Sequence, residues 1–122
     1  MDTTPHLPAE LVLALRRGIF AEFVSMLENL DLDRLERILS PDCADENPLP
    51  FQPPGPRGVA LKIACWKALA PQARTSVEQV QDTPDGLCAR WITRVGDQVS
   101  RWEGRFSFQD QRICAFGARR VD

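Results

Sequence analysis

Between residues 101 and 108, polar and apolar side chains alternate without a break. The polar series is Arg101, Glu103, Arg105 and Ser107, and the apolar series is Trp102, Gly104, Phe106 and Phe108. This period of two predicts a β-strand with one solvated face and one buried face. We expect Trp91 and Phe116, on neighbouring strands, to share the buried face. A buried face rich in rings and poor in acids and bases indicates a cavity for a small apolar molecule.

Helices are expected in the first part of the chain. Apolar residues at three- and four-residue spacings predict a helix over 8–30, a short helix over 33–39 and a third helix over 58–69. Asp33 and Glu36 have the spacing of a capping box at the start of the second helix. Prolines follow the second and third helices and are expected to end them.

Strands are expected in the second part. A short extended segment is predicted at 42–47, followed by a proline-rich ordered loop over 48–58. Period-two patterns between turn residues predict four further strands, at 75–83, 87–95, 98–109 and 112–121. Short turns favour antiparallel neighbours. The fold class is therefore α+β, with three N-terminal helices packed on a strongly curved antiparallel sheet that forms a cone-shaped α+β barrel. The chain of 122 residues is expected to be a single domain, with residues 1–7 as a tail.

Charge and targeting signals narrow the classes of partner. The formal net charge is −2, which is too small to drive binding to nucleic acid or to a membrane surface. No apolar run reaches the length that spans a bilayer, and the first ten residues do not resemble a signal peptide. We therefore expect a cytoplasmic protein that binds neither nucleic acid nor a membrane.

Metal and cofactor chemistry is not expected. The four cysteines, at 43, 65, 88 and 114, lack the paired spacing of a zinc site, and scattered thiols of this kind are usually small buried side chains. His6, the single histidine, falls in the predicted tail. Histidine-based catalysis and a histidine-rich metal site are therefore nearly excluded, and no metal or cofactor is predicted.

Two stretches carry a family resemblance. SPDCADENPLP at 40–50 and DQRICAFGARRVD at 110–122, in this order of predicted elements, resemble the nuclear transport factor 2-like superfamily. The branch they resemble contains the SnoaL-like polyketide cyclases and the limonene-epoxide hydrolases. The resemblance implies a cone-shaped pocket. It also implies a role for Asn47, which is similar to the asparagine that holds the attacking water in the epoxide hydrolases. Asp45 stands where that family has an aromatic hydroxyl.

The chain departs from the catalytic pattern of both relatives. The closing-strand aspartate of the epoxide hydrolases would fall at Ala118, and their neighbouring tryptophan corresponds to Phe116. Their arginine and second aspartate would fall near Trp91 and Thr93. The cyclases use a histidine in the sheet, and the predicted sheet of this chain has none. Ordinary epoxide hydrolysis is therefore not expected.

Asp45 and Asn47 are the candidate catalytic residues. Period two places Cys43, Asp45 and Asn47 on one side of the first extended segment. If that side faces the cavity, Asp45 is a carboxylate among rings that can serve as a general acid or base, and Asn47 can orient a substrate oxygen. The alternative is that Asp45 lies at the rim and caps the loop by binding the backbone ahead of Pro48.

The remaining candidates are predicted from their face of the sheet. Residues proposed to bind the ligand are Trp66, Trp91, Thr93, Trp102, Phe106, Phe116 and Arg120, although rings of this kind are more often core. The arginines at 90, 94, 101 and 105 are expected on the outer face, either as a solvated surface or as the interface of a homodimer. A slip of one residue would turn Arg90 inward in place of Trp91.

Two classes of function remain open from the sequence. The first is an enzyme that binds a small apolar oxygenated metabolite and catalyses a cofactor-free cyclase, isomerase or lyase reaction. The second is a non-catalytic ligand-binding protein, or a dimeric interaction protein, that has lost the catalytic residues of the family.

Overall fold

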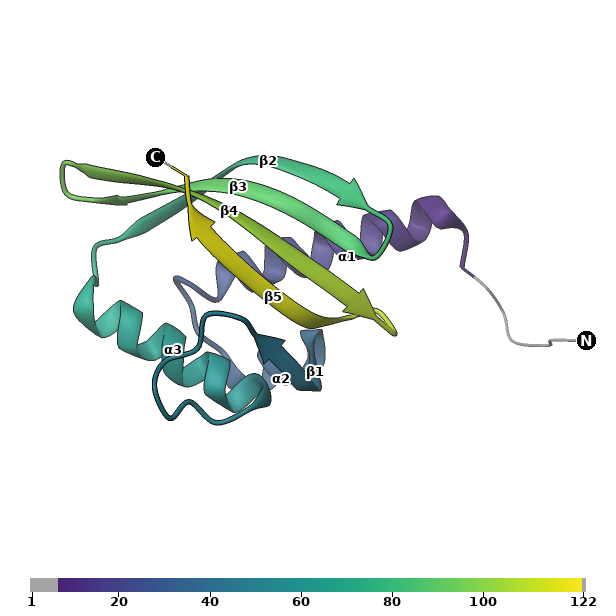
Figure 1. Ribbon diagram of the computed structural model, residues 1–122, viewed down its shortest axis with the longest axis horizontal. Coiled ribbons are helices and arrows are strands. Elements are labelled where there is room, and N and C mark those ends of the chain that lie inside the picture. The colour runs from purple at the N-terminus through teal and green to yellow at the C-terminus, as the bar shows by residue number, and fades with distance from the viewer. Residues whose placement is uncertain (1–6, 122) are drawn as a thin grey trace, which may run out of the picture.

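The computed structural model describes residues 7–121 as three helices and five strands (Figure 1). The elements are α1 (Ala9–Ser25), α2 (Leu32–Ile38), β1 (Leu39–Asp45), α3 (Gly55–Leu69), β2 (Arg74–Thr83), β3 (Gly86–Val95), β4 (Gln98–Gln109) and β5 (Arg112–Arg120). The helices lie on one side of the sheet, with α1 passing behind the strands and α3 below them (Figure 1). The predicted α+β fold is therefore confirmed. Residues 1–6 of the predicted tail, which include His6, lie outside the described residues.

The sheet is mostly antiparallel and open. Its strands lie in the order β1-β5-β4-β3-β2, which leaves β1 and β2 at the two edges. β2, β3, β4 and β5 are antiparallel neighbours, as their short turns predict. β1 instead runs parallel to β5. This exception arises because β1 follows α2 directly, so no hairpin turn sets its direction. The sheet curves over the helices without closing into a barrel.

Two helix boundaries differ from the sequence prediction near residue 30. α1 ends at Ser25, whose hydroxyl donates a hydrogen bond of 2.6 Å to the carbonyl of Glu22. α2 begins after Asp31, whose carboxylate accepts a 3.3 Å hydrogen bond from the backbone N–H of Arg34. The predicted capping box starting at Asp33 was therefore wrong, because an acceptor two residues earlier satisfies the first turn.

α3 starts three residues earlier than the sequence predicts, at Gly55. Pro56 lies in its first turn, where a missing N–H costs nothing, so the proline-rich segment becomes the start of the helix. Gly55 has a φ of +75°, and a Cβ at this position would overlap the carbonyl oxygen of Pro41. The loop over 48–58 is thus shorter than predicted, and its end is fixed against the start of β1.

The strand alternation places the rings as predicted. Phe106 and Phe108 are buried in β4, whereas Arg101 and Arg105 are exposed. The ring of Phe106 stacks on Phe116 of β5, with centroids 6.0 Å apart and planes 8° from parallel. Rings from α1 pack edge-on against this pair, so the core lies between α1 and the concave face of the sheet.

Gly58, in the first turn of α3, is expected to reject any side chain. A Cβ there would fall 1.7 Å from the carbonyl oxygen of Pro53. Gly58→Ala should therefore lower the free energy of unfolding by about 1–3 kcal/mol, because the backbone of the preceding loop must move. Gly18→Ala is the matched control, since Gly18 is a helical glycine with open space around it. That variant should gain roughly 0.5–1 kcal/mol in a urea titration, and an equal effect at both glycines would contradict the expectation.

Candidate functional site

A partly buried ion pair joins the end of β1 to the middle of α3. The side chain of Asp45 is 4% exposed, and the Nζ of Lys62 lies 2.9 Å from its Oδ2 and 3.1 Å from its Oδ1. The side chain of Lys62 is 30% exposed, so the lysine is the partner that solvent or a ligand reaches. Sequence reasoning missed Lys62. The sequence signal for Lys62 was weak, because it is one charged residue on a helix face that is otherwise predicted to be apolar.

Every acceptor position of the Asp45 carboxylate is occupied. Oδ1 also accepts the backbone N–H of Asn47 at 2.9 Å, and Oδ2 accepts the Nε2 of Gln52 at 3.2 Å. The ammonium of Lys62 donates a further hydrogen bond of 2.7 Å to the carbonyl of Asn47. The side chain of Asp45 also caps the loop by accepting the backbone N–H ahead of Pro48, which is the alternative that the sequence left open.

Asn47 fastens this loop to the last strand of the sheet. Its Oδ1 accepts the backbone N–H of Ala118 at 2.8 Å. Ala118 is the position at which the resemblance places a catalytic aspartate, so the loop contacts the backbone there and no carboxylate is present. The side-chain nitrogen of Asn47, Nδ2, makes no hydrogen bond within residues 7–121 and remains able to donate.

Aromatic rings lie directly beside the ion pair. Phe116 is the register partner of Asp45, and the Nζ of Lys62 lies 5.9 Å from the centroid of its ring. Phe116 also contacts Phe23 of α1, with centroids 5.3 Å apart. The ion pair therefore has a carbon-lined wall on its sheet side, where the effective dielectric constant is lower than in water.

Other predicted ligand-binding residues extend this wall along the concave face. Trp91 lies opposite Trp102, which lies opposite Arg120, and Thr93 lies opposite Ser100. Trp91 points inward: its ring covers Gly104 so closely that a Cβ there would overlap it. Arg90 accordingly points outward and pairs with Glu103 at 3.1 Å. The register predicted for β3 is thus the one found.

Phe106 lies deeper than the other members of the predicted set. It is 4% exposed and contacts Phe20, Phe23, Trp91 and Phe116. The space predicted as a hollow among these rings is filled at this depth by the rings themselves.

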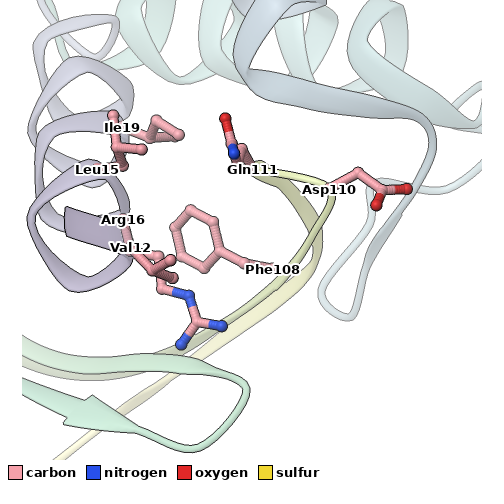
Figure 2. Close-up of a pocket in the computed structure, with 7 residues that line it drawn as sticks. All are labelled: Val12, Leu15, Arg16, Ile19, Phe108, Asp110 and Gln111. Atoms are coloured by element: carbon pink, nitrogen blue, oxygen red, sulfur yellow. The ribbon is translucent and has the colours of Figure 1, made fainter. Parts of the chain in front are cut away.

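Two surface hollows lie away from the ion pair. One, of about 310 Å³, is formed by the turn after α1, the end of α3 and the start of β2, and it contains Trp66, Lys67 and Arg74. Trp66 lines this hollow, which contains none of the other residues predicted to bind the ligand. The other hollow, of about 200 Å³, lies between α1 and the β4–β5 turn (Figure 2).

The hollow of Figure 2 has an apolar wall and one cation. Val12, Leu15 and Ile19 of α1 face Phe108, and the guanidinium carbon of Arg16 lies 5.8 Å from the centroid of the Phe108 ring. Arg16 also donates to the carbonyls of the β2–β3 turn at 3.5 Å. The hollow also contains the carboxylate of Asp110 and the amide of Gln111, which come from the β4–β5 turn and lie at its rim. No reactive pair of groups faces this hollow among the residues that line it.

The cysteines do not form a reactive centre with the ion pair. Burial raises the pKa of the Cys43 thiol to about 12, and nearby negative charge, including that of Asp45, adds to the shift. The thiol is therefore protonated at neutral pH and is a poor nucleophile. The prediction of buried thiols was right for Cys43 and wrong for Cys65, which is exposed on α3.

The described helices include none with the length and apolar character needed to cross a membrane. Within residues 7–121, no group of three or more acidic, cysteine or histidine side chains converges in a way that could hold a metal ion.

The fold is that of SnoaL-like and nuclear transport factor 2-like proteins. A SnoaL-like polyketide cyclase from Agrobacterium tumefaciens strain C58 superposes with a TM-score of 0.73 at 15% identity, over 88% of this chain and 91% of that chain. A protein proposed to be an isomerase of the SnoaL-like family, from the same organism, gives 0.76 at 15% identity, over 89% and 99%. A nuclear transport factor 2-like protein of unknown function from Mesorhizobium loti gives 0.71 at 20% identity, over 96% and 98%. No family model and no curated protein sequence matches the chain.

Proposed function

We propose that this chain binds a small oxygenated metabolite at the concave face of the sheet and catalyses a cofactor-free proton transfer of the cyclase or isomerase type. One observation carries the proposal: a carboxylate that is 4% exposed is held against an ammonium group beside an aromatic ring. A positioned carboxylate beside an ammonium group can serve in general acid–base catalysis. The cyclase and isomerase descriptions of the structural neighbours support the reaction class.

Lys62 is the group that receives the substrate oxygen. Its side chain is more exposed than that of Asp45, so a carbonyl oxygen arriving along Phe116 meets the ammonium first. A fixed positive charge there stabilises the enolate that forms when a neighbouring carbon loses a proton. The side-chain nitrogen Nδ2 of Asn47 can donate a hydrogen bond to the same substrate oxygen. The apolar body of the substrate lies along Trp91, Trp102 and Thr93, and Arg120 binds an anionic end.

Asp45 is the group that moves the proton. The carboxylate removes a proton from the carbon next to the carbonyl and returns it to a different atom of the same molecule, so no oxidant or reductant is needed. An acceptor position must be vacated for this step. The hydrogen bond from Gln52, at 3.2 Å, is the longest of those reaching the carboxylate and is the one expected to open.

A second candidate is a ligand-binding protein without catalysis. The observation that favours it is the complete set of hydrogen bonds at Asp45, which holds the loop to α3 and leaves no acceptor position vacant. In that case the ion pair fixes the shape of the site, and Lys62 binds an oxygen of the ligand without any proton transfer.

Solvent deuterium exchange separates the two candidates. β-Keto esters are incubated in D2O and exchange at the carbon between the carbonyls is followed by NMR, while quenching of tryptophan fluorescence reports binding. Asp45→Asn should slow enzyme-dependent exchange about a hundredfold and leave binding within a few-fold. Asp42→Asn, on the same strand but exposed, is the control and should change neither. Binding without exchange above background in the natural sequence would overturn the catalytic proposal and support the second candidate.

A further inference from the structure

The hollow of Figure 2 presents unfilled apolar surface. Val12, Leu15 and Ile19 recur at spacings of three and four residues, so they form an apolar stripe on one side of α1. None of the three side chains is fully buried. Phe108 of β4 faces the stripe across the hollow, whose volume is about 200 Å³. An apolar cavity of about 150 Å³ takes up a benzene ring, so this hollow has room for a ring and one polar substituent.

Arg16 interrupts the stripe with a cation that lacks a counterion. The neighbouring Arg17 is paired, because its Nε and Nη2 bind the two carboxylate oxygens of Asp82 at 3.1 and 3.0 Å. Arg16 reaches only the carbonyls of Thr83 and Pro84, both through Nη1 and both at 3.5 Å. The two nitrogens with which Arg17 binds a carboxylate are therefore unoccupied in Arg16 within residues 7–121. No carboxylate of that range forms an ion pair with it.

The acidic groups on the adjoining turns do not neutralise this cation. Asp85 accepts the hydroxyl groups of Thr83 at 3.2 Å and Ser107 at 3.3 Å. Asp110 lines the hollow, but its carboxylate points away from the guanidinium of Arg16 (Figure 2). The guanidinium instead lies over the Phe108 ring, 5.8 Å from its centroid. Beside such a ring the local dielectric constant is lower than in water, so an anion is attracted more strongly.

The β4–β5 turn supplies a second polar group. Asp110 and Gln111 have φ values of 51° and 62°, which a two-residue hairpin turn requires at both positions. Glutamine rarely adopts this backbone conformation, and residues held in rare conformations cluster at ligand sites. The Gln111 side chain extends toward Leu15 and Ile19 at the edge of the hollow (Figure 2). Its amide makes no hydrogen bond within residues 7–121 and is able to donate to a ligand.

We propose that this hollow binds a small amphipathic carboxylate. The apolar body of the ligand packs between the stripe of α1 and the Phe108 ring. Its carboxylate accepts two parallel hydrogen bonds from the Nε and Nη2 of Arg16, which is the geometry that a guanidinium favours. Arg16 is the one cation among the lining residues, so a singly charged anion matches it better than a phosphate dianion. The hollow shares no residue with the proposed catalytic site.

An NMR titration with three probes tests this proposal. Protein labelled with 15N is titrated at pH 7 and constant ionic strength with 3-phenylpropionate, its neutral amide 3-phenylpropionamide, and acetate. The backbone N–H signals of Ile19 and Gln111 should shift and saturate with 3-phenylpropionate. The neutral amide should bind about tenfold more weakly, because it loses the charge-assisted hydrogen bonds. Acetate should not saturate these signals, because it has no apolar body.

Three variants separate the contribution of charge from that of apolar contact. Arg16→Met should weaken 3-phenylpropionate about tenfold and leave the neutral amide unchanged. Arg17→Met is the matched control, since it makes the same change in net charge one residue away and should leave both affinities within about twofold. Leu15→Ala should weaken both probes. Should Arg16→Met lose the native spectrum, Arg16→Lys takes its place, because a lysine keeps the charge without the two parallel donors and should weaken the carboxylate alone.

Several results would overturn the proposal. Equal affinity for the carboxylate and its neutral amide would make the hollow a purely apolar site. Equal weakening by Arg16→Met and Arg17→Met would mean that only net charge matters. Shifts confined to the concave face, at residues such as Trp91 and Phe116, would assign the probe to the proposed catalytic site. Shifts at Ile19 and Gln111 that follow protein concentration without any probe would show a second copy of the chain in the hollow.

Discussion

Phe106→Ala is expected to lower the free energy of unfolding by about 3–5 kcal/mol. Phe106 is 4% exposed and its ring contacts four others, the nearest being Phe20 with centroids 4.9 Å apart. Neighbouring rings come from α1, β3 and β5, so they cannot all move into the vacated space, and a cavity remains. Urea denaturation followed by circular dichroism measures the loss. Benzene should raise the melting temperature of the variant more than that of the natural sequence, because the new cavity is apolar.

Phe51→Ala is the matched control for this prediction. Phe51 is fully exposed in the loop before α3, and its removal should change stability by less than about 0.5 kcal/mol. A loss at Phe106 as small as that at Phe51 would mean that the concave face is hollow at this depth. In that event the ligand site would extend further into the fold than the ring contacts allow.

Lys62→Met is expected to cost about 3 kcal/mol of folding free energy. The substitution removes the cation that pairs with the Asp45 carboxylate, whose side chain is only 4% exposed. The value lies at the lower end of the range for breaking a buried ion pair, since Lys62 itself is 30% exposed. Adding Asp45→Asn to this variant should restore much of the loss, because an uncharged amide has a lower desolvation cost. The four members of this double-mutant cycle are compared by chemical denaturation.

Lys67→Met provides the control for the lysine substitution. Lys67 lies on the same helix and is also partly buried, but it donates to the backbone carbonyl of Glu28 and has no carboxylate partner in the described part of the chain. Its substitution should cost less than about 1 kcal/mol. If Lys62→Met costs no more than this control, Asp45 does not depend on its cation, and the ion pair is not the centre of the site.

The sequence predicted the sheet better than the site. Alternation from Arg101 to Phe108 specified which face of β4 is buried, because a strand has only two faces and a period of two assigns every side chain to one of them. That reasoning also placed Trp91 inward and Arg90 outward, as found. Helix ends were less accurate, because competing acceptors such as Asp31 are equivalent in sequence and differ only in the folded turn.

The ion pair could not be predicted, because it depends on the distance between two elements. Asp45 was selected from its place on a short strand, but its partner is 17 positions further along the chain on a helix whose start was misplaced. Once α3 begins at Gly55, Lys62 lies in its middle and faces the end of β1. No local sequence pattern predicts that Lys62 lies close to Asp45. Asn47 was selected for a role in catalysis, and its contact with Ala118 likewise required the parallel pairing of two strands far apart in sequence.

The parallel pairing of β1 with β5 has a consequence for the order of folding. β5 is the last of the described strands, and β1 has no other neighbour in the described sheet. A polypeptide that has not yet reached Arg112 therefore lacks the strand that holds Asn47, and its first strand has an unpaired edge on both sides. Long-range closure of this kind is slow relative to hairpin formation. The hydrogen bond between Asn47 and Ala118 should consequently form late during refolding, after the β2–β4 meander has already acquired its protection from hydrogen exchange.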